Sequence, residues 1–471
     1  MIMANTLTAI RRKLPRKVIL LLSLCILAFI FYGFNWYKMT GRSFPDNEDL
    51  GFMSYRLHLS NVDTYYEQRL GWPTSTLGGI LFKRDTIPYP NPNENKTFVV
   101  LVWKYWTWLK NRHVHNFEKV ALGKSKNKID NSGQEEESYL KDCSVKNCIF
   151  SGDDNLMPTA DAVLVHLQRG VVPEVKNRNP RQRWVFLNDE SPTHAFSLAK
   201  ERPSLERFYN VFNWSMTYRT DADVPVPYGR TLPLEGPMMT TIELDEIAAL
   251  VPNWRKKRRD RHATILMSNC GASARNNCLK ELRKYINVDV YGKCSDVEDF
   301  KNSCPGHFKE DCNAMDNWSS PVGEDCTAID EYVFYLVLED TRCYQYLTEN
   351  IFYNAYAKGA IPVIWGPSFD DVESLLPPYS FLFIEKSVHV EKVAQLMLNV
   401  IESDALLLSM HLWRNTFEVV NEHGYFGSKF YHLCRLCEAL NYNDEREKIY
   451  GKEDIDWILN PSKICAKTNM I

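Results

Sequence analysis

Residues 334–366 constrain the possible folds of this chain more than any other part of its sequence. The stretch begins with a short, apolar and β-rich run, residues 334–338, which is typical of a buried strand. Helical spacing follows, with Thr348 as the N-cap and Gly359 as the residue that ends the helix. A second apolar run, residues 360–364, completes a β–α–β unit. Such a unit predicts an α/β fold with a parallel sheet and with ligands at the carboxyl ends of the strands.

The loop that leads into this helix is a candidate phosphate-binding site. Backbone N–H groups and the positive end of the helix dipole would point at any group bound there, which suits a phosphate. Most β–α–β units only support a fold, however. The pattern by itself therefore leaves both a nucleotide site and a plain scaffold open.

The chain as a whole is long enough, at 471 residues, for two domains with their own cores. Its formal net charge of −3 gives no overall preference for nucleic acid. The basic run at residues 254–262 fits a solvated linker between two domains better than a nucleic-acid site. The 13 cysteines indicate an oxidising compartment, because cytosolic proteins seldom keep so many.

The amino terminus has the pattern of a membrane anchor. A basic segment, residues 11–17, precedes an apolar run at residues 18–34, which lies at the short limit for a membrane span. No small-x-small cleavage site follows, which favours a retained anchor over a cleaved signal peptide, and the basic flank predicts a cytoplasmic amino terminus. We therefore expect a cytoplasmic tail at 1–17, a single type II span at 18–34 and a polar stem at 35–96.

Three sequons agree with a lumenal location for the rest of the chain. Asn95, Asn213 and Asn317 each begin an Asn-x-Ser/Thr motif, which is glycosylated only in the secretory pathway. Each motif is short and common by chance. Together with the anchor and the cysteines they indicate one compartment.

Several motifs resemble those of one enzyme family. The central stretch, FYLVLEDTRCYQYLTENIFYNAYAKGAIPVIWG, resembles the donor-binding signature of the α1,3-fucosyltransferases, which typically read close to FYLxFENSxxxDYxTEKxxxNAxxxGxVPVVxG. Three positions depart from it: Asp340 replaces the usual Asn, Gln345 a commonly acidic residue, and Asn350 the Lys of TEK. Upstream, RWVFLNDESP, FNWSMTYRTDADVPVPYG and the Ser-Ala-Arg that ends at Arg275 resemble further family motifs in the family's order.

The resemblance runs from about residue 98 to about residue 440 and implies a fold. That fold is two facing Rossmann-like domains, the GT-B arrangement, behind the anchor and the stem. Residues 97–250 would form the acceptor-side domain and residues 251–440 the GDP-fucose-binding domain. The tail, residues 441–471, has no counterpart in the resemblance.

The resemblance also implies an activity. It predicts inverting transfer of L-fucose from GDP-β-L-fucose to a GlcNAc hydroxyl of a glycoprotein glycan, in α1,3 linkage, on the lumenal side of the Golgi membrane. GDP-fucose and a GlcNAc-containing acceptor are then the expected partners. No cofactor is expected to be required, and a divalent cation would act at most as a stimulant.

The resemblance assigns roles to individual residues. Glu190 ends a predicted strand before Ser-Pro; alone it suits a turn, but the family places its general base there. Arg275 corresponds to the Arg that contacts the diphosphate, and Glu349 to a ribose ligand. Tyr346 and Asp340 would lie near the donor sugar. Asn350 occupies the donor-binding position where the family has a phosphate-binding Lys.

The cysteines near the carboxyl terminus, Cys434 and Cys437, form a CxxC motif. A redox motif would need a thioredoxin-like strand before it, and a zinc site would need a second pair, for which Cys143 and Cys148 are available in number. A lumenal chain favours disulfides. The family bonds such a pair back to amino-terminal cysteines, which implies partners for Cys434 and Cys437 at Cys143 and Cys148.

Asp221 and Asp223 form an Asp-x-Asp motif of the kind that binds a divalent cation in metal-dependent sugar transferases. Two carboxylates beside Arg219 also suit a hydrogen-bonded loop, and the corresponding family sequence is not a metal motif. We expect no metal site.

Asn350 supports an alternative function. An amide offers a phosphate only a dipole, so the chain could be a catalytically weak or inactive homologue that binds a glycan or a protein in the Golgi. Arg342, in the same loop, is the candidate replacement for the missing Lys.

Overall fold

The computed structural model describes residues 53–82, 90–104, 140, 143–240, 243–267, 269–296, 327–423, 431–444 and 448–466. The expected cytoplasmic tail, the anchor at 18–34 and Asn317 lie outside the described residues. Within the described ranges, no helix combines the length and the apolar character that a membrane span requires. The described residues from Ser54 onwards belong to one compact unit.

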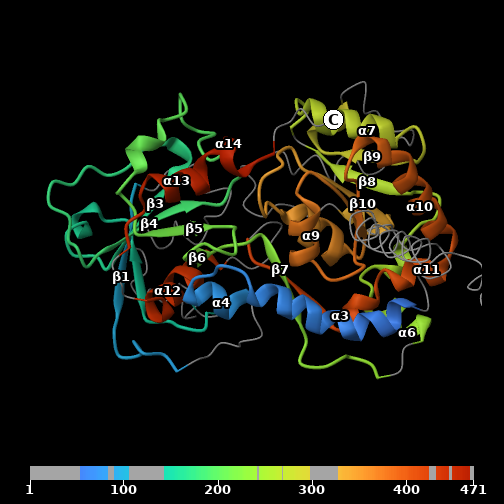
Figure 1. Ribbon diagram of the computed structural model, residues 1–471, viewed down its shortest axis with the longest axis horizontal. Helices are drawn as coiled ribbons and strands as arrows, with labels where there is room; N and C mark the ends of the chain where they lie inside the picture. The colour runs from blue at the N-terminus through green and yellow to red at the C-terminus, as the bar shows by residue number, and fades with distance from the viewer. Residues whose placement is uncertain are drawn as a thin grey trace, which may run out of the picture. The chain divides into compact units, whose positions relative to one another are not determined.

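Among these residues, six strands form a first sheet in which every pair of neighbours is parallel (Figure 1). Its spatial order is β2-β1-β3-β4-β5-β6. The strands are β1 (Phe98–Val102), β2 (Cys148–Ser151), β3 (Ala162–His166), β4 (Arg183–Asn188), β5 (Trp214–Thr217) and β6 (Val224–Pro225). β3 is buried along its whole length, which is why its sequence is an apolar run without alternation.

A second, five-stranded parallel sheet follows in the described part of the chain, with the order β12-β11-β10-β8-β9. Its strands are β8 (Ala263–Leu266), β9 (Val288–Tyr291), β10 (Phe334–Leu338), β11 (Ile361–Trp365) and β12 (Leu382–Phe383). Around it lie α7 (Ser273–Leu282), α9 (Phe369–Leu375), α10 (Val390–Glu402) and α11 (Asp404–Ser409), and α6 (Leu244–Leu250) contacts α11. The α/β fold with parallel sheets, expected from residues 334–366, is confirmed.

The helix between β10 and β11 differs from the expected α-helix. It is a π-helix, Asn350–Ala355, continued by a 3-10 turn, Tyr356–Lys358. Gly359 ends it with a φ of 72°, and a Cβ at this residue would lie 1.9 Å from the backbone oxygen of Pro252. Both the backbone conformation and the lack of space therefore require glycine there. A π-helix is rare and often accompanies a functional site.

The chain returns to the first sheet after it has built the second. β7 (Gly229–Pro233), which follows the first sheet, pairs antiparallel with β13 (Phe417–Asn421), which follows the second. Helix α12 (His432–Tyr442) then packs into the core of the first sheet, as do residues of α4 (Thr76–Phe82). The expected stem thus contains folded elements, α3 (Met53–Leu70) and α4. The expected tail likewise contains α13 (Lys452–Leu459) and α14 (Pro461–Ile464), and α13 packs on the first sheet.

Disulfide bonds fix α12 in this position. Cys434 is bonded to Cys143 and Cys437 to Cys148, which are the partners that the family resemblance implies. Two further bonds in the described part of the chain, Cys270–Cys294 and Cys343–Cys465, were not expected. The second of these ties the carboxyl-terminal end of the described chain to the loop after β10.

We expect the loss of one α12 bridge, in a Cys148→Ala/Cys437→Ala variant, to lower the free energy of unfolding by about 2–5 kcal/mol, because the bridge closes a long loop of the unfolded chain. Denaturant titration measures the loss, and Cys278→Ala is the control, since Cys278 is buried and free. Peptide mapping without reductant that found Cys434 bonded to Cys437 would contradict the pairing.

Two of the three sequons lie in the described residues, and their asparagines differ in exposure. Asn95 is exposed in a turn before β1, so its glycosylation stays a prediction. Glycosylation of Asn213 also stays a prediction, and its side chain is buried with both ends of its amide in hydrogen bonds. Its oxygen accepts from the Trp184 backbone N–H at 2.8 Å, and its nitrogen donates to the Lys448 carbonyl at 2.7 Å. A glycan on that nitrogen would replace the hydrogen bond to the Lys448 carbonyl.

Candidate active site

Glu190 lies just beyond the carboxyl end of β4, where the sequence predicted it. Its side chain is 7% exposed, and the Tyr346 hydroxyl donates to its Oε2 at 3.1 Å. Burial raises the pKa of Tyr346 well above its ordinary value, so the phenol keeps its proton and remains a donor. The structure thus joins a carboxylate from the first sheet to the loop after β10 of the second. We call the residues 339–349 of this loop the donor loop.

Asp340, in the donor loop, lies near residues from two other segments. Asn269 donates from Nδ2 to Asp340 Oδ2 at 3.3 Å, and His194 Nδ1 lies 4.0 Å from Asp340 Oδ1. Arg275, on α7, donates to the backbone oxygen of the same Asn269. Burial lowers the pKa of Arg275, and the nearby Asp340 and Glu339 oppose that shift. Arg275 and Asp340 therefore share one site, to which sequence reasoning had not assigned His194.

Glu339, the first residue of the donor loop, has a strongly raised pKa. It is buried and accepts from Thr348 Oγ1 at 2.6 Å. Burial raises its pKa to about 8; Glu349 and Asp340 act in the same direction, while Thr348 and Arg275 oppose them. A carboxyl group that can hold a proton near neutral pH therefore lies at the end of β10. Its raised pKa arises from burial, which no local sequence pattern reports.

This raised pKa predicts a pH dependence of stability. The folded chain keeps the Glu339 proton up to about pH 8, whereas the unfolded chain loses it near the ordinary value of 4.5. Between these values folding takes up a proton, so the free energy of unfolding should fall as pH rises. We expect Glu339→Gln to remove much of this fall, measured by denaturant titration at pH 5 and pH 8. Glu385→Gln, on the surface, is the control and should keep the wild-type slope.

Asn350 faces the protein interior rather than open solvent. Its Oδ1 accepts from the Tyr335 hydroxyl at 2.9 Å, and its Nδ2 donates to Thr348 Oγ1 at 3.1 Å. Asn354 also donates to Asn350 Oδ1 at 3.1 Å. Arg342 is half-buried and donates from Nε to the Gly366 carbonyl at 2.9 Å. The Asn at the family's Lys position is thus part of a hydrogen-bond network at the start of the π-helix.

Gln345 has a structural role that its departure from the family pattern did not reveal. Its backbone has a φ of 55°, a strained conformation for a residue with a side chain. The side chain accepts from the Thr220 backbone N–H at 2.9 Å and donates to Thr220 Oγ1 at 2.9 Å. Its backbone N–H donates to Asp371 Oδ2 at 3.1 Å. Gln345 therefore links the donor loop to the Tyr-Arg-Thr-Asp-Ala-Asp segment after β5.

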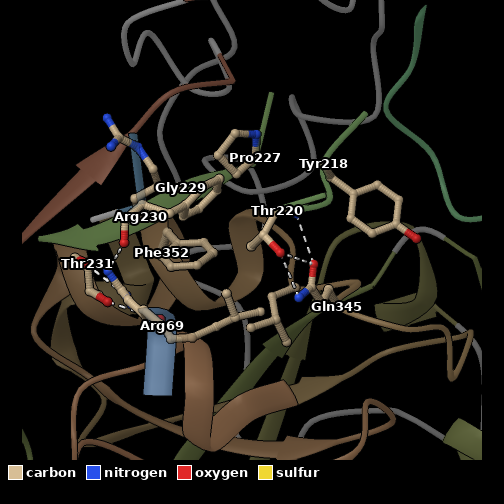
Figure 2. Close-up of a pocket in the computed structure, with 12 residues that line it drawn as sticks. Arg69, Tyr218, Thr220, Pro227, Gly229, Arg230, Thr231, Gln345 and Phe352 are labelled. Carbon is tan, nitrogen blue, oxygen red and sulfur yellow. Dashed lines mark hydrogen bonds between the residues drawn. The ribbon is translucent and has the colours of Figure 1, made fainter. Parts of the chain in front are cut away.

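A small cavity lies beside this link. Figure 2 shows the Gln345–Thr220 contact at one end and the buried Arg69 of α3 at the other. Phe352 of the π-helix lies between them, against Gly229, where a Cβ would come within 2.4 Å of its ring. The close approach of β7 to the π-helix therefore requires glycine at 229.

The two carboxylates of the Asp-x-Asp motif have separate partners. Asp221 Oδ1 accepts from Arg219 Nε at 2.7 Å. Asp223 Oδ2 accepts from the Ser215 backbone N–H at 2.9 Å and from the Tyr450 hydroxyl at 2.5 Å. The motif forms a hydrogen-bonded loop, and Asp223 connects it to the carboxyl-terminal segment.

Comparisons with known proteins identify this arrangement. One family model, described as "Fucosyltransferase, N-terminal", matches residues 95–229, and another, "Glycosyltransferase family 10 (fucosyltransferase) C-term", matches residues 256–457. These matches show that the chain is a glycosyltransferase, and its described residues form two parallel sheets of an α/β fold. The chain belongs to glycosyltransferase family 10, the α1,3-fucosyltransferase family.

Individual relatives carry related names. The chain is 27% identical over 321 residues to 4-galactosyl-N-acetylglucosaminide 3-alpha-L-fucosyltransferase 9 of Mus musculus and of Homo sapiens, with 67% of this chain and 76% of each relative covered. It is 26% identical over 342 residues to the corresponding fucosyltransferase FUT6 of Pongo pygmaeus, with coverages of 70% and 77%. A crystallised α1,3-fucosyltransferase with GDP-fucose is 15% identical, with a TM-score of 0.38 and coverages of 79% and 98%.

Proposed function

We propose that this enzyme transfers L-fucose from GDP-β-L-fucose, with inversion, to a GlcNAc hydroxyl of a glycoprotein glycan in α1,3 linkage. The contact between Glu190 and Tyr346 carries the proposal, because it joins the candidate base to the loop whose sequence matches the family's donor signature. The names of the relatives, all 3-alpha-L-fucosyltransferases, support the linkage.

The chemistry assigns one task to each part of the site. The acceptor hydroxyl is neutral, so a base must take its proton as the new bond forms, and Glu190 is the residue for this step. The departing GDP gains negative charge, which the guanidinium group of Arg275 on α7 would stabilise. Tyr346 holds Glu190 in place through the hydrogen bond to its Oε2.

The proposal includes the two-domain GT-B arrangement, with the acceptor on the side of the first sheet, residues 97–250, and the donor on the side of the second, residues 251–440. It also includes a type II orientation in the Golgi membrane, supported by the basic and apolar segments at 11–34. The disulfides of the described chain support an oxidising lumen.

The test is an assay of the purified full-length chain with GDP-fucose and three acceptors: an N-glycan core, an antennal LacNAc and a LacdiNAc. We expect one acceptor class to receive fucose, and NMR of the product to give an α1,3 linkage. Hydrolysis or binding of GDP-fucose without transfer to any of them would contradict the proposal.

The second candidate, a weak or inactive homologue, is favoured by one observation: the Asn350 side chain is occupied by Tyr335 and Thr348 and supplies no cation. Calorimetric titration of GDP separates the two. If Arg342 replaces the missing Lys, Arg342→Ala should weaken GDP binding by roughly ten- to a hundredfold, the effect of losing a charged hydrogen bond. Asn350→Lys, added to that variant, should restore part of the affinity.

Arg258→Ala is the matched control, because Arg258 is an exposed Arg that pairs with Asp260 and Glu331. It should bind GDP as the wild type does. If the wild type binds GDP strongly and Arg342→Ala does not weaken this binding, Arg342 does not replace the missing Lys. The proposal that the chain is an active enzyme would not be affected by that result. Absence of GDP and GDP-fucose binding in the wild type would favour the inactive homologue.

A further inference from the structure

Three side chains with metal-ligand chemistry meet in the interior, next to the candidate base. Asp189 follows β4, His423 lies two residues beyond β13, and His432 is the first residue of α12. All three are buried, with exposed fractions of 0%, 1% and 1%. His423 Nε2 lies 3.0 Å, and His432 Nε2 3.8 Å, from Asp189 Oδ2. One possible ligand atom from each residue lies within 4.8 Å of the other two.

This geometry is close to that of a bound transition metal ion. Zinc binds imidazole nitrogen and carboxylate oxygen at about 2.0–2.2 Å, which separates two ligands of a tetrahedral site by roughly 3.3–3.5 Å. The two distances from Asp189 bracket this value, so small side-chain rotations would bring the atoms to ligand positions. Two imidazoles and a carboxylate are ligands that zinc accepts, whereas calcium and magnesium prefer oxygen alone.

The surroundings hold the three residues in place. The Tyr228 hydroxyl donates to the Asp189 backbone oxygen at 3.0 Å. The Tyr228 ring also stacks on the His423 ring, with centroids 4.1 Å apart and planes 9° apart. His432 begins the helix that two disulfides tie to the first sheet. These contacts restrict the positions of the three side chains, as neighbouring groups around metal ligands do.

We propose that Asp189, His423 and His432 form a binding site for one divalent ion of the zinc class. The ion would join the end of β4 to the chain after β13 and to α12, three segments that are distant in sequence. It would also fix the turn that carries Glu190, the residue next to Asp189. This last consequence rests on the proposed function, whereas metal binding itself does not.

The test uses Co²⁺ as a spectroscopic probe. The full-length protein, prepared without a polyhistidine tag and dialysed against a chelator, is titrated with Co²⁺. We expect one equivalent to bind with the visible absorption of a four-coordinate Co²⁺ ion, and Zn²⁺ to displace it. His432→Gln should weaken this binding by more than about 100-fold, since even residues that only support a ligand are worth 10- to 100-fold.

Two controls keep the result interpretable. His113→Ala/His115→Ala removes two histidines outside the described residues and should keep the full Co²⁺ signal. Near-ultraviolet circular dichroism shows whether His432→Gln is folded, and the wild-type titration stands without any variant. Absence of stoichiometric Co²⁺ and Zn²⁺ binding in the wild type overturns the proposal, as does binding that survives His432→Gln in a folded protein. Neither readout depends on fucose transfer, so a failed transfer assay leaves this result intact.

Discussion

Replacing Glu190 with Gln is expected to lower fucose transfer by roughly 10²–10⁴-fold, the usual contribution of a general base. The amide is nearly the same size and can still accept the Tyr346 hydrogen bond that reaches Oε2 in the wild type. The turn after β4 should therefore keep its shape, and GDP-fucose binding should stay near the wild-type value. What the variant lacks is a lone pair basic enough to take the acceptor proton as the bond to fucose forms.

The measurement is kcat with saturating donor and acceptor, together with calorimetric titration of GDP-fucose. Glu201→Gln is the matched control, because Glu201 is exposed in the loop that follows the same turn and should not affect turnover. Near-normal turnover in a folded Glu190→Gln protein that binds the donor would exclude Glu190 as the base.

Strands with continuous apolar runs could be predicted closely from the sequence. β10 has the predicted bounds, and β11 is displaced from its predicted range by one residue. Both are buried along their length, so every side chain contributes to the signal. Glu190 could also be placed at a strand end, since a Pro after Ser191 marks where the chain leaves the sheet.

The π-helix could not be predicted, because its cause is not local. Gly359 was correctly predicted to end the helix, and the predicted N-cap, Thr348, lies one residue before the observed one, Glu349. The winding depends on contacts with Tyr335 in β10 and with Gly229, the first residue of β7. Gln345 is a similar case. Its sequence position showed only a departure from the family pattern, whereas its partner Thr220 lies 125 residues away.

The return of the chain to the first sheet was also hidden from sequence reasoning. The apolar residues of helix α12 are enough to predict that it lies in a core. They do not indicate whether it packs against the first sheet or the second. Only the cysteines indicated the first sheet, because the family resemblance implies bonds from Cys434 and Cys437 to amino-terminal cysteines. The cluster of Asp189, His423 and His432 exists because of this return, since His432 begins α12 and Asp189 directly follows β4.

The second large effect is expected at Glu422, which lies between β13 and α12. Its carboxylate is 2% exposed and accepts at Oε1 from Arg230 Nε and from an Arg435 terminal nitrogen, both at 2.8 Å. Burial alone would raise its pKa, but the two guanidinium groups outweigh burial and lower it. Glu422 therefore carries a charge that both arginines need.

Glu422→Ala should lower the free energy of unfolding by about 3–5 kcal/mol, the cost of leaving buried charges without their partner. Arg435 keeps Glu438, at 2.7 Å, but Arg230 loses the carboxylate that it bonds, and Arg69 adds a further buried positive charge nearby. Denaturant titration at pH 7 measures the loss. Glu418→Ala, on the exposed side of the same strand β13, is the matched control and should cost much less.

The pH dependence gives an independent readout of the same carboxylate. The pKa of Glu422 is lower in the folded chain than in the unfolded chain. Its contribution to the free energy of unfolding is therefore complete at a pH above the pKa of the unfolded chain, and it is lost as the pH falls through the pKa of the folded chain. The difference in stability between wild type and Glu422→Ala should therefore shrink in acid. A difference below about 1 kcal/mol at pH 7, similar to an exposed ion pair, would show that the three groups are solvated rather than buried.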